Sequence, residues 1–300
     1  MMKKIVMLLT ALCIMVMSSV AMAAMEGTDI SDGYITVQGY GALPPQAVNP
    51  AQARMMARRA AVVDGYRQLA EAVQGVNVDS QTTVQNMLVT SDVINTRVSA
   101  VIKGAQVVSE QVIPDGGYEV TMRVAVFGVQ NSLAAAILPP SAQKEAFPAV
   151  GGAAASAPAS ASASSASGSY NATNGGSSAA DPRSAASMNV QVQGTYTGVI
   201  IDCSGLGLHT AMSPVIMTEG GQKIYGYKNL DYHKVIAKGM AGYVDEGGSS
   251  PRCGNNPLRL RAVDVDNGAN PVLSQADADK MLLENQRSHF LDECNVVFVR

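Results

Sequence analysis

Few side chains in this sequence have the chemistry that catalysis requires. The chain holds four cysteines and three histidines. Cys203 and His209 lie close together in sequence, and a thiolate beside an imidazole is the arrangement of a nucleophilic hydrolase. Catalytic pairs meet in space rather than along the chain, so this spacing is weak evidence. An exported hydrolase that uses Cys203 or the Asp202 region is therefore the weakest functional hypothesis.

A metal site is the second chemistry to consider, because Cys253, His289 and Cys294 are all metal-ligating residue types. No two of them have the short spacing of a zinc finger, so a disulfide among Cys203, Cys253 and Cys294 is the better interpretation. An oxidising compartment would allow one disulfide and leave one free thiol, and the spacing does not say which pair forms. We expect no catalytic, cofactor-binding or metal-binding residues, and no enzyme activity.

Glycines at 205 and 207 give a third pattern, Gly205-Leu206-Gly207-Leu208, which resembles part of a phosphate-binding loop. The segment lacks a third glycine and the Lys-Ser/Thr pair of a P-loop. A turn after a strand is the expected structure.

One predicted helix carries several cations: Arg54, Arg58, Arg59 and Arg67. A solvated helix face is the ordinary interpretation, because long cationic side chains keep their charge in water. The sharper hypothesis is an interaction surface that docks an acidic neighbouring subunit. Met55 and Met56, at the start of the same helix, are expected to pack in the core.

The first 23 residues have the pattern of a secretory signal peptide. A basic start at Lys3-Lys4 precedes a short apolar run and the cleavage motif Ala21-Met22-Ala23. The run is shorter than the roughly 20 apolar residues that a membrane helix needs. Cleavage between Ala23 and Ala24 would deliver the mature chain to the periplasm or cell envelope.

Cys13 lies within this leader and raises the alternative of a lipid anchor. A lipoprotein signal needs a small residue immediately before the acylated cysteine, and Leu12 is too large. We therefore interpret Cys13 as an ordinary apolar residue of the leader.

The net charge of −3 argues against a protein that binds the phosphate backbone of nucleic acids. Tryptophan is absent, which disfavours an aromatic-lined sugar groove.

An Ala/Ser/Gly-rich segment over residues 149–187 divides the chain. Such a composition buries too little apolar surface to offset its ordering entropy, so we expect a flexible, disordered linker. It separates a domain at 33–138 from a second domain at 190–300. The tether would let the second domain reach a separate partner.

The first domain has the signals of an α+β fold. Residues 34–38 alternate like a half-buried strand, and Asn49-Pro50 starts a helix that ends at Gly75. Ser91-Asp92 starts a second helix that ends at Gly104. A hairpin with its turn at Asp115-Gly116-Gly117 follows. Two helices packed on a small antiparallel sheet would bury both apolar faces.

The second domain is expected to be a mostly-β, mixed α+β unit. Short β-rich runs occur at 197–202 and around the turn at 219–221, and residues 258–265 alternate cleanly. Ser274 and Asp277 form a capping box for a helix that reaches about Glu293. The last strand, 296–299, is expected to lie inside the sheet.

Residues 57–70, Ala-Arg-Arg-Ala-Ala-Val-Val-Asp-Gly-Tyr-Arg-Gln-Leu-Ala, resemble the helix of the LPP-twenty outer-membrane lipoprotein family. The N-terminal domain of flagellar assembly protein T is similar. Ile102-Lys103-Gly104-Ala105 and the hairpin at 115–120 fit the same pattern, so the resemblance covers about 33–130. It implies an α+β domain of envelope assembly without catalytic residues or cofactor. The unsuitable Leu12-Cys13 sequence puts lipid anchoring in doubt.

The resemblance and the leader together predict an exported, non-enzymatic envelope protein. It would have a structural role at the outer membrane or the flagellar base, through envelope or flagellar protein partners, self-association and peripheral membrane contact. The alternative is a periplasmic binding module, with the second domain as receptor for peptidoglycan or a small ligand.

Overall fold

The computed structural model describes residues 28–128, 130–140, 143–151 and 195–300. The predicted signal peptide, its cleavage site at Ala23 and Ala24, Cys13, and residues 152–187 of the predicted linker lie outside the described residues. No helix of the described ranges is long and apolar enough to cross a membrane.

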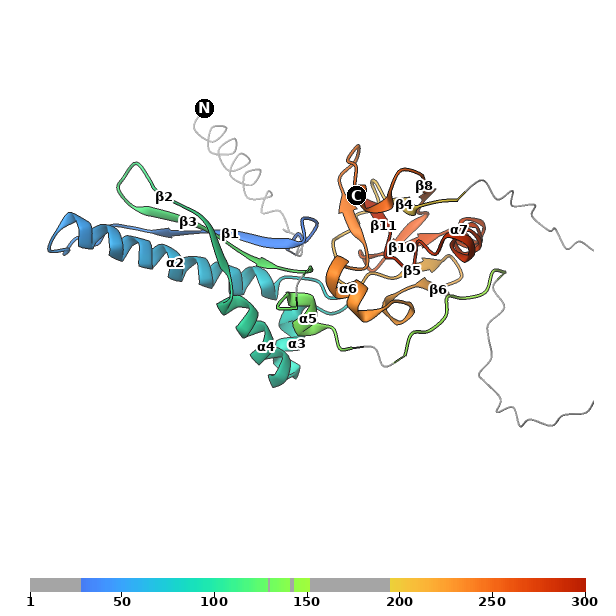
Figure 1. Cartoon of the computed structure of the whole chain (residues 1–300), viewed down its shortest axis with the longest axis horizontal. Helices are drawn as coiled ribbons and strands as arrows, with labels where there is room; N and C mark the ends of the chain where they lie inside the picture. Colours follow the sequence, from blue (N-terminus) through green and yellow to red (C-terminus); the bar gives the residue numbers. More distant parts are fainter. Residues whose placement is uncertain (1–27, 129, 141–142, 152–194) are drawn as a thin grey trace, which may run out of the picture.

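The first domain is built on a three-stranded antiparallel sheet, with α2 along one of its faces (Figure 1). Its strands are β1 (Tyr34–Gly41), β2 (Gln106–Val112) and β3 (Tyr118–Ala125), in the order β1-β3-β2. The predicted strand at 34–38 and the predicted hairpin are thus confirmed. Alternate residues of β3, Val120, Met122 and Val124, are buried toward the helix, as the period of a strand requires.

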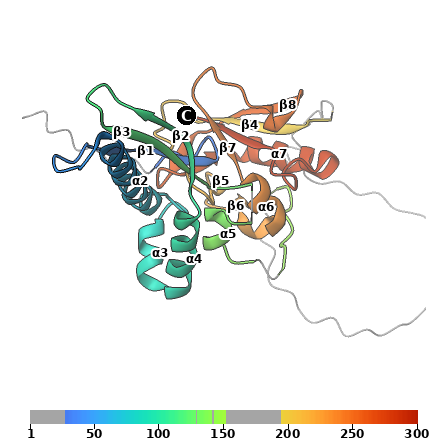
Figure 2. The same cartoon turned by 60° about the vertical axis from the view of Figure 1, so that its left-hand side comes forward.

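Helix α2 (Pro50–Gln74) begins and ends where the sequence predicts. The Asn49 side chain accepts a hydrogen bond from the Gln52 backbone N–H at 2.8 Å, and Pro50 fits the first turn because its missing N–H would have no partner there. Three further helices gather at the other end of α2, toward the second domain (Figure 2): α3 (Val84–Thr90), α4 (Asp92–Lys103) and α5 (Leu133–Ile137). Of these, α4 was predicted, and α3 and α5 were not.

The expectation that Met55 and Met56 pack in the core is wrong, since their exposed fractions are 64% and 46%. The inward stripe of α2 consists of small residues instead: Ala57, Ala61 and Gly65 are buried. Glycines on β1 are the physical reason. A Cβ on Gly39 would lie 2.2 Å from the Ala61 carbonyl oxygen, so helix and strand approach too closely for a large side chain between them.

The second domain holds two four-stranded sheets. One is parallel, in the order β7-β11-β4-β8, from β4 (Gly198–Asp202), β7 (Gly242–Val244), β8 (Pro257–Arg261) and β11 (Val296–Val299). The other has the order β6-β5-β10-β9, from β5 (Ile216–Thr218), β6 (Lys223–Tyr225), β9 (Asp264–Asp266) and β10 (Asn270–Leu273). The last strand, β11, is internal, as predicted.

Helices α6 (Tyr232–Lys238) and α7 (Gln275–Ser288) and the short 3-10 helices η1 (Tyr227–Asn229) and η2 (Pro251–Cys253) complete this domain. The Ser274 hydroxyl accepts from the Asp277 N–H at 3.1 Å, which confirms the predicted cap of α7. The helix ends before the predicted Glu293, because His289 adopts a left-handed conformation, with φ of 52°.

The two domains pack directly against each other. The Met212 N–H donates to the Asn77 carbonyl at 2.9 Å, and the Ser213 N–H donates to the Val78 carbonyl at 2.7 Å. The Arg300 guanidinium of the second domain binds the Asp29 carboxylate at 2.7 Å. The structure therefore differs from two independently placed units, since the second domain is docked on the first.

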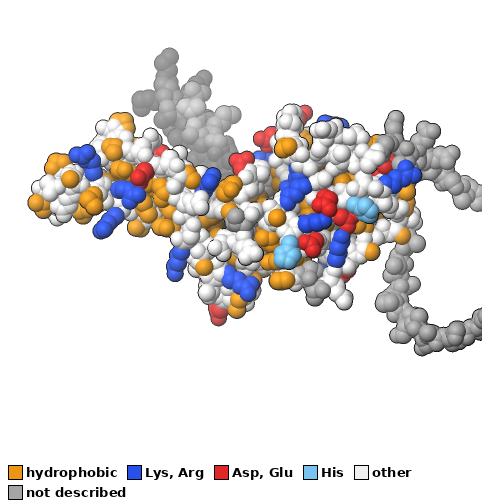
Figure 3. All heavy atoms as spheres, in the orientation of Figure 1, with side chains coloured by type: hydrophobic (Ala, Val, Ile, Leu, Met, Phe, Trp, Pro, Cys, Tyr) orange, Lys and Arg blue, Asp and Glu red, His pale blue; other side chains and the backbone are white. Residues whose placement is uncertain are grey.

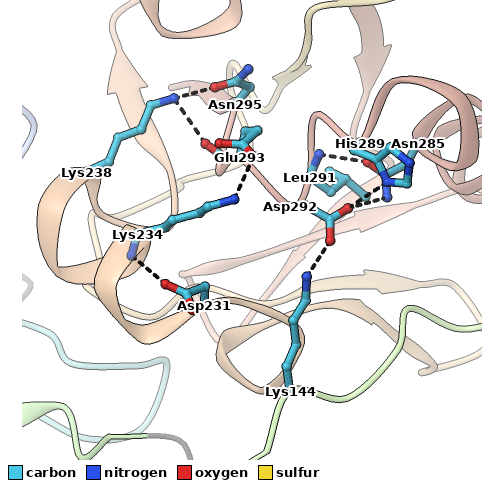
Figure 4. A network of polar contacts seen from close by, with 10 residues as sticks. All are labelled: Lys144, Asp231, Lys234, Lys238, Asn285, His289, Leu291, Asp292, Glu293 and Asn295. Carbon is cyan, nitrogen blue, oxygen red and sulfur yellow. Dashed lines mark hydrogen bonds and ion pairs between the residues drawn. The ribbon is translucent and has the colours of Figure 1, made fainter.

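Residues 143–151 form a strap that runs from the first domain onto the second. Lys144 binds the Asp292 carboxylate, in a network on the loop after α7 (Figure 4). Phe147 stacks on Tyr225 with ring centroids 6.3 Å apart. The Gly151 N–H donates to Asp279 at 3.2 Å, so residues 149–151 of the predicted linker are attached to the second domain.

Candidate functional site

The four arginines of the predicted interaction surface all lie exposed on α2, but they are not equally free. Arg58 binds Glu110 of β2 at 2.7 Å. Arg67 binds Asp64 and Glu71 on its own helix, at 2.8 and 2.6 Å.

Two arginines near the start of α2 keep their charge unpaired. The Arg54 Nε donates only to the Pro50 carbonyl, at 3.4 Å, and the Arg59 guanidinium has no acidic partner among the described residues. They flank Met55 and Met56, and Figure 3 shows cationic and hydrophobic side chains side by side over this domain. This end of α2 extends away from the second domain (Figure 1). A docking surface around Arg54 and Arg59 stays a prediction.

The two edges of the first-domain sheet differ in a way that the sequence did not reveal. At the β1 edge, the Tyr40 N–H donates to the Asp64 carboxylate of α2 at 3.0 Å, and the helix lies close against the strand. At the β2 edge, all seven residues are exposed. Val107, Val108 and Val112 are 41%, 45% and 54% exposed. An uncovered strand of this kind can pair with another chain.

The second domain has a cavity of about 650 Å³ where its parallel strands end, which we call the sheet-end cavity. Ile200 and Asp202 of β4, Val299 of β11, Arg259 and Arg261 of β8, and the loop 246–249 line it. Parallel sheets usually have both faces covered by other elements. Here the loop 246–249 lies beside the hollow at this end of the sheet.

The charges in the sheet-end cavity are only partly paired. The Asp202 carboxylate accepts hydrogen bonds from Ser204, which lower its pKa, and the Ser204 N–H lies 2.9 Å away. Arg261 is 3.8 Å from the same carboxylate. Arg259 lies two residues before Arg261, on the same face of β8, and has no acidic partner among the described residues.

The structure argues against the Cys203 nucleophile. Cys203 is 1% exposed, and burial raises the pKa of its thiol to about 12, so the reactive thiolate does not form near neutral pH. No hydrogen bond joins Cys203 to His209 within the described residues, and the His209 backbone N–H donates to the Gly268 carbonyl at 2.7 Å. Gly205 and Gly207 lie in a turn after β4, as predicted.

The oxidation state of the three cysteines of the second domain also differs from expectation. Cys203, Cys253 and Cys294 are all free, buried thiols, whereas the sequence predicted one disulfide. The Cys253 thiol instead donates to the Val199 carbonyl at 3.1 Å. The His289 side chain is 70% exposed beside Asp292, at 3.5 Å, so it does not join the buried cysteines in a metal site. The described residues contain no cluster of three His, Cys, Asp or Glu side chains suited to a metal ion.

Comparison with known families assigns a match to each domain. Residues 44–125 match the model of the family described as LPP20 lipoprotein. Residues 198–300 match the second domain of Treponema pallidum Tp0624. No curated protein matches the chain. The resemblance to the LPP-twenty family is confirmed, and the match indicates an exported protein associated with the cell envelope.

Proposed function

We propose, from the match of residues 44–125 to the LPP20 lipoprotein family, that this is a non-enzymatic envelope protein that works by protein–protein contact. It would act in the periplasm, at the outer membrane or the flagellar base, with its first domain as the contact module. The observation that carries this proposal is the open β2 edge, exposed on all seven residues.

The charges at the β2 edge are compatible with the binding of a second copy of the same chain. Glu110 is the only charged residue of β2, and Arg58 already neutralises it at 2.7 Å. Two copies can thus meet without unpaired like charges at their edges. In a two-fold symmetric contact, the same patch serves both partners.

The pairing of β2 with β3 limits which residues of β2 can form a regular ladder with a second copy of the chain. A bulge between Val107 and Ser109 interrupts the ladder with β3, which leaves 109–112 as the regular part of the strand. A two-fold axis between Glu110 and Gln111 would place each of these residues opposite the other in the partner strand. The two sheets would then join into one continuous antiparallel sheet.

Analytical ultracentrifugation of the mature chain tests the proposal. We expect a dimer or larger assembly at up to about 100 µM, which detects association free energies of about −5.5 kcal/mol or stronger. The double variant Val108→Lys/Val112→Lys should be monomeric, because lysines on an edge strand oppose pairing. Val89→Lys on α3 is the matched control, since Val89 is 84% exposed. A monomeric wild-type chain, or assembly unchanged in the double variant, would refute self-association through β2.

A separate experiment tests the envelope role. The mature chain should sediment with isolated envelope fractions. If the chain stays monomeric and fails to bind the envelope, the contact function is wrong.

A further inference from the structure

We propose that the sheet-end cavity of the second domain binds a small carboxylate ligand with a short apolar group. The first observation is its position. In open sheets with parallel strands, ligands bind beyond the carboxyl ends of the strands. The cavity lies at the ends of β4, β8 and β11, and its volume of about 650 Å³ is in the range of small-molecule sites.

The second observation is an arginine pair on one face of β8. Arg259 and Arg261 are paired in register with Ile200 and Asp202 of the neighbouring strand. Alternate residues of a strand share a face, so both guanidinium groups belong to the cavity side. Among the described residues, Asp202 is the only carboxylate within ion-pair distance of either guanidinium, at 3.8 Å from Arg261. Arg259 is thus left with donors for an incoming oxyanion, and a guanidinium fork matches a carboxylate with two parallel hydrogen bonds.

The other side chains that line the sheet-end cavity determine which kind of anion can bind there. Asp202 and Glu246 also line the cavity, and the lowered pKa of Asp202 keeps its carboxylate ionised. These negative charges repel a ligand with two or more charges, so a monoanionic carboxylate is favoured over a phosphate. Ile200 and Val299 add an apolar surface for a short hydrocarbon group.

Ligand binding in the sheet-end cavity is independent of self-association through β2, since the two surfaces belong to different domains. The loop 246–249 supplies a local reporter. Gly247 and Gly248 line the cavity, and their amide signals should respond to an occupant.

NMR titration of the full mature chain with butyrate tests the inference. We expect saturable shifts of the Gly247 and Gly248 amides with a Kd of about 1 mM, since so few ligand atoms cannot bind tightly. Butyramide, the neutral analogue, should bind at least 10-fold more weakly. Inorganic phosphate should also bind more weakly than butyrate.

Arg259→Ala should weaken butyrate at least 10-fold while the rest of the spectrum stays that of a folded protein. Arg287→Ala is the matched control, because Arg287 is exposed on α7 and does not line the cavity. Non-saturating shifts, equal binding of butyramide, or unchanged butyrate affinity in Arg259→Ala would overturn the site. Tighter binding of phosphate than of butyrate would overturn the carboxylate class.

Discussion

A largely buried arginine, with no carboxylate partner in the part of the chain that the structure describes, holds three parts of the second domain together. The Arg252 guanidinium donates to the carbonyls of Cys294 at 2.8 Å, Lys238 at 2.7 Å and Gly239. Burial lowers the pKa of Arg252, because removal from water disfavours its charge. The carbonyls supply the compensation that an acidic side chain would give elsewhere.

Replacing this arginine should therefore be costly. We expect Arg252→Ala to reduce the free energy of unfolding by about 3 kcal/mol or more, since it leaves several carbonyl groups without partners. Urea denaturation of the mature protein measures the change. Arg287→Ala, at an exposed position without an acidic partner among the described residues, should change it by no more than about 0.5 kcal/mol. Equal effects of the two variants would contradict this role of Arg252.

The buried thiols give a second prediction at the residue scale. Burial raises the pKa of Cys203 to about 12 and that of Cys253 to about 11, and it also raises the pKa of Cys294. A thiol reagent at pH 8 should therefore label none of them in the native mature chain and all three after unfolding. Labelling of a single thiol after unfolding would reveal a disulfide and contradict the free thiols of the structure.

The same shifts predict how stability depends on pH. Each folded pKa lies above the unfolded value of about 8.5, so folding favours the protonated thiol. This contribution to stability is complete below about pH 8.5 and is lost as the pH rises toward about 11 for Cys253 and about 12 for Cys203. Between pH 9 and the folded pKa of Cys203, the Cys203→Ala variant should lose less stability than the wild type. Urea denaturation at each pH measures the free energy of unfolding of both proteins.

At the scale of elements, the contact of α2 with β1 depends on glycine. Gly39→Ala would place a Cβ 2.2 Å from the Ala61 carbonyl oxygen and 2.4 Å from the Gly65 nitrogen. The strand and helix must then move apart, and we expect a loss of about 3 kcal/mol or more in unfolding free energy. Gly104→Ala is the control, because the atoms nearest to its added Cβ lie 3.4 and 3.5 Å away and its φ of −84° suits alanine. A loss below about 1 kcal/mol for Gly39→Ala would show that the contact can relax.

Local signals predicted most elements of the chain, because caps, turns and alternation act over a few residues. Asn49-Pro50, the hairpin turn and Ser274 are such cases. The inward face of α2 was mispredicted, because its small residues face glycines on β1 that are distant in sequence. The run 258–265 was expected as one strand, yet the Ala262 N–H bonds to Asp202 and the Val263 N–H to Val272. The chain changes sheets there, at the point where the apolar positions shift from Leu258, Leu260 and Ala262 to Val263 and Val265.

The candidate sites were harder to predict, because their residues come together through strand pairing between segments that are distant in sequence. Arg259 and Asp202 line the same cavity because β4 and β8 pair in parallel, and no local pattern reports that pairing. The open β2 edge likewise depends on the strand order, which alternation along one strand does not specify. The four arginines were visible in the sequence, but the pairing of Arg58 with Glu110 and of Arg67 with Asp64 was not.

At the scale of the whole molecule, backbone contacts and the strap make one body of two domains. The hydrogen bonds of Met212 and Ser213 with residues 77–78 involve main-chain atoms, so side-chain types gave no sign of them. A further main-chain hydrogen bond joins the domains at Gly128, whose N–H donates to the Ile236 carbonyl at 2.8 Å. The described start of the segment that was expected to act as a tether, residues 149–151, is thus attached to the second domain.

Cutting the chain should consequently leave its halves together. With a specific protease site inserted between Ser160 and Ala161, we expect the two fragments of the mature protein to co-elute from a sizing column after cleavage. Residues 143–151 would remain on the first fragment and hold the second through Asp292 and Tyr225. Lys144→Ala/Phe147→Ala should weaken the association, because it removes both contacts. Separate elution of the fragments without these substitutions would mean that the docked arrangement does not persist in solution.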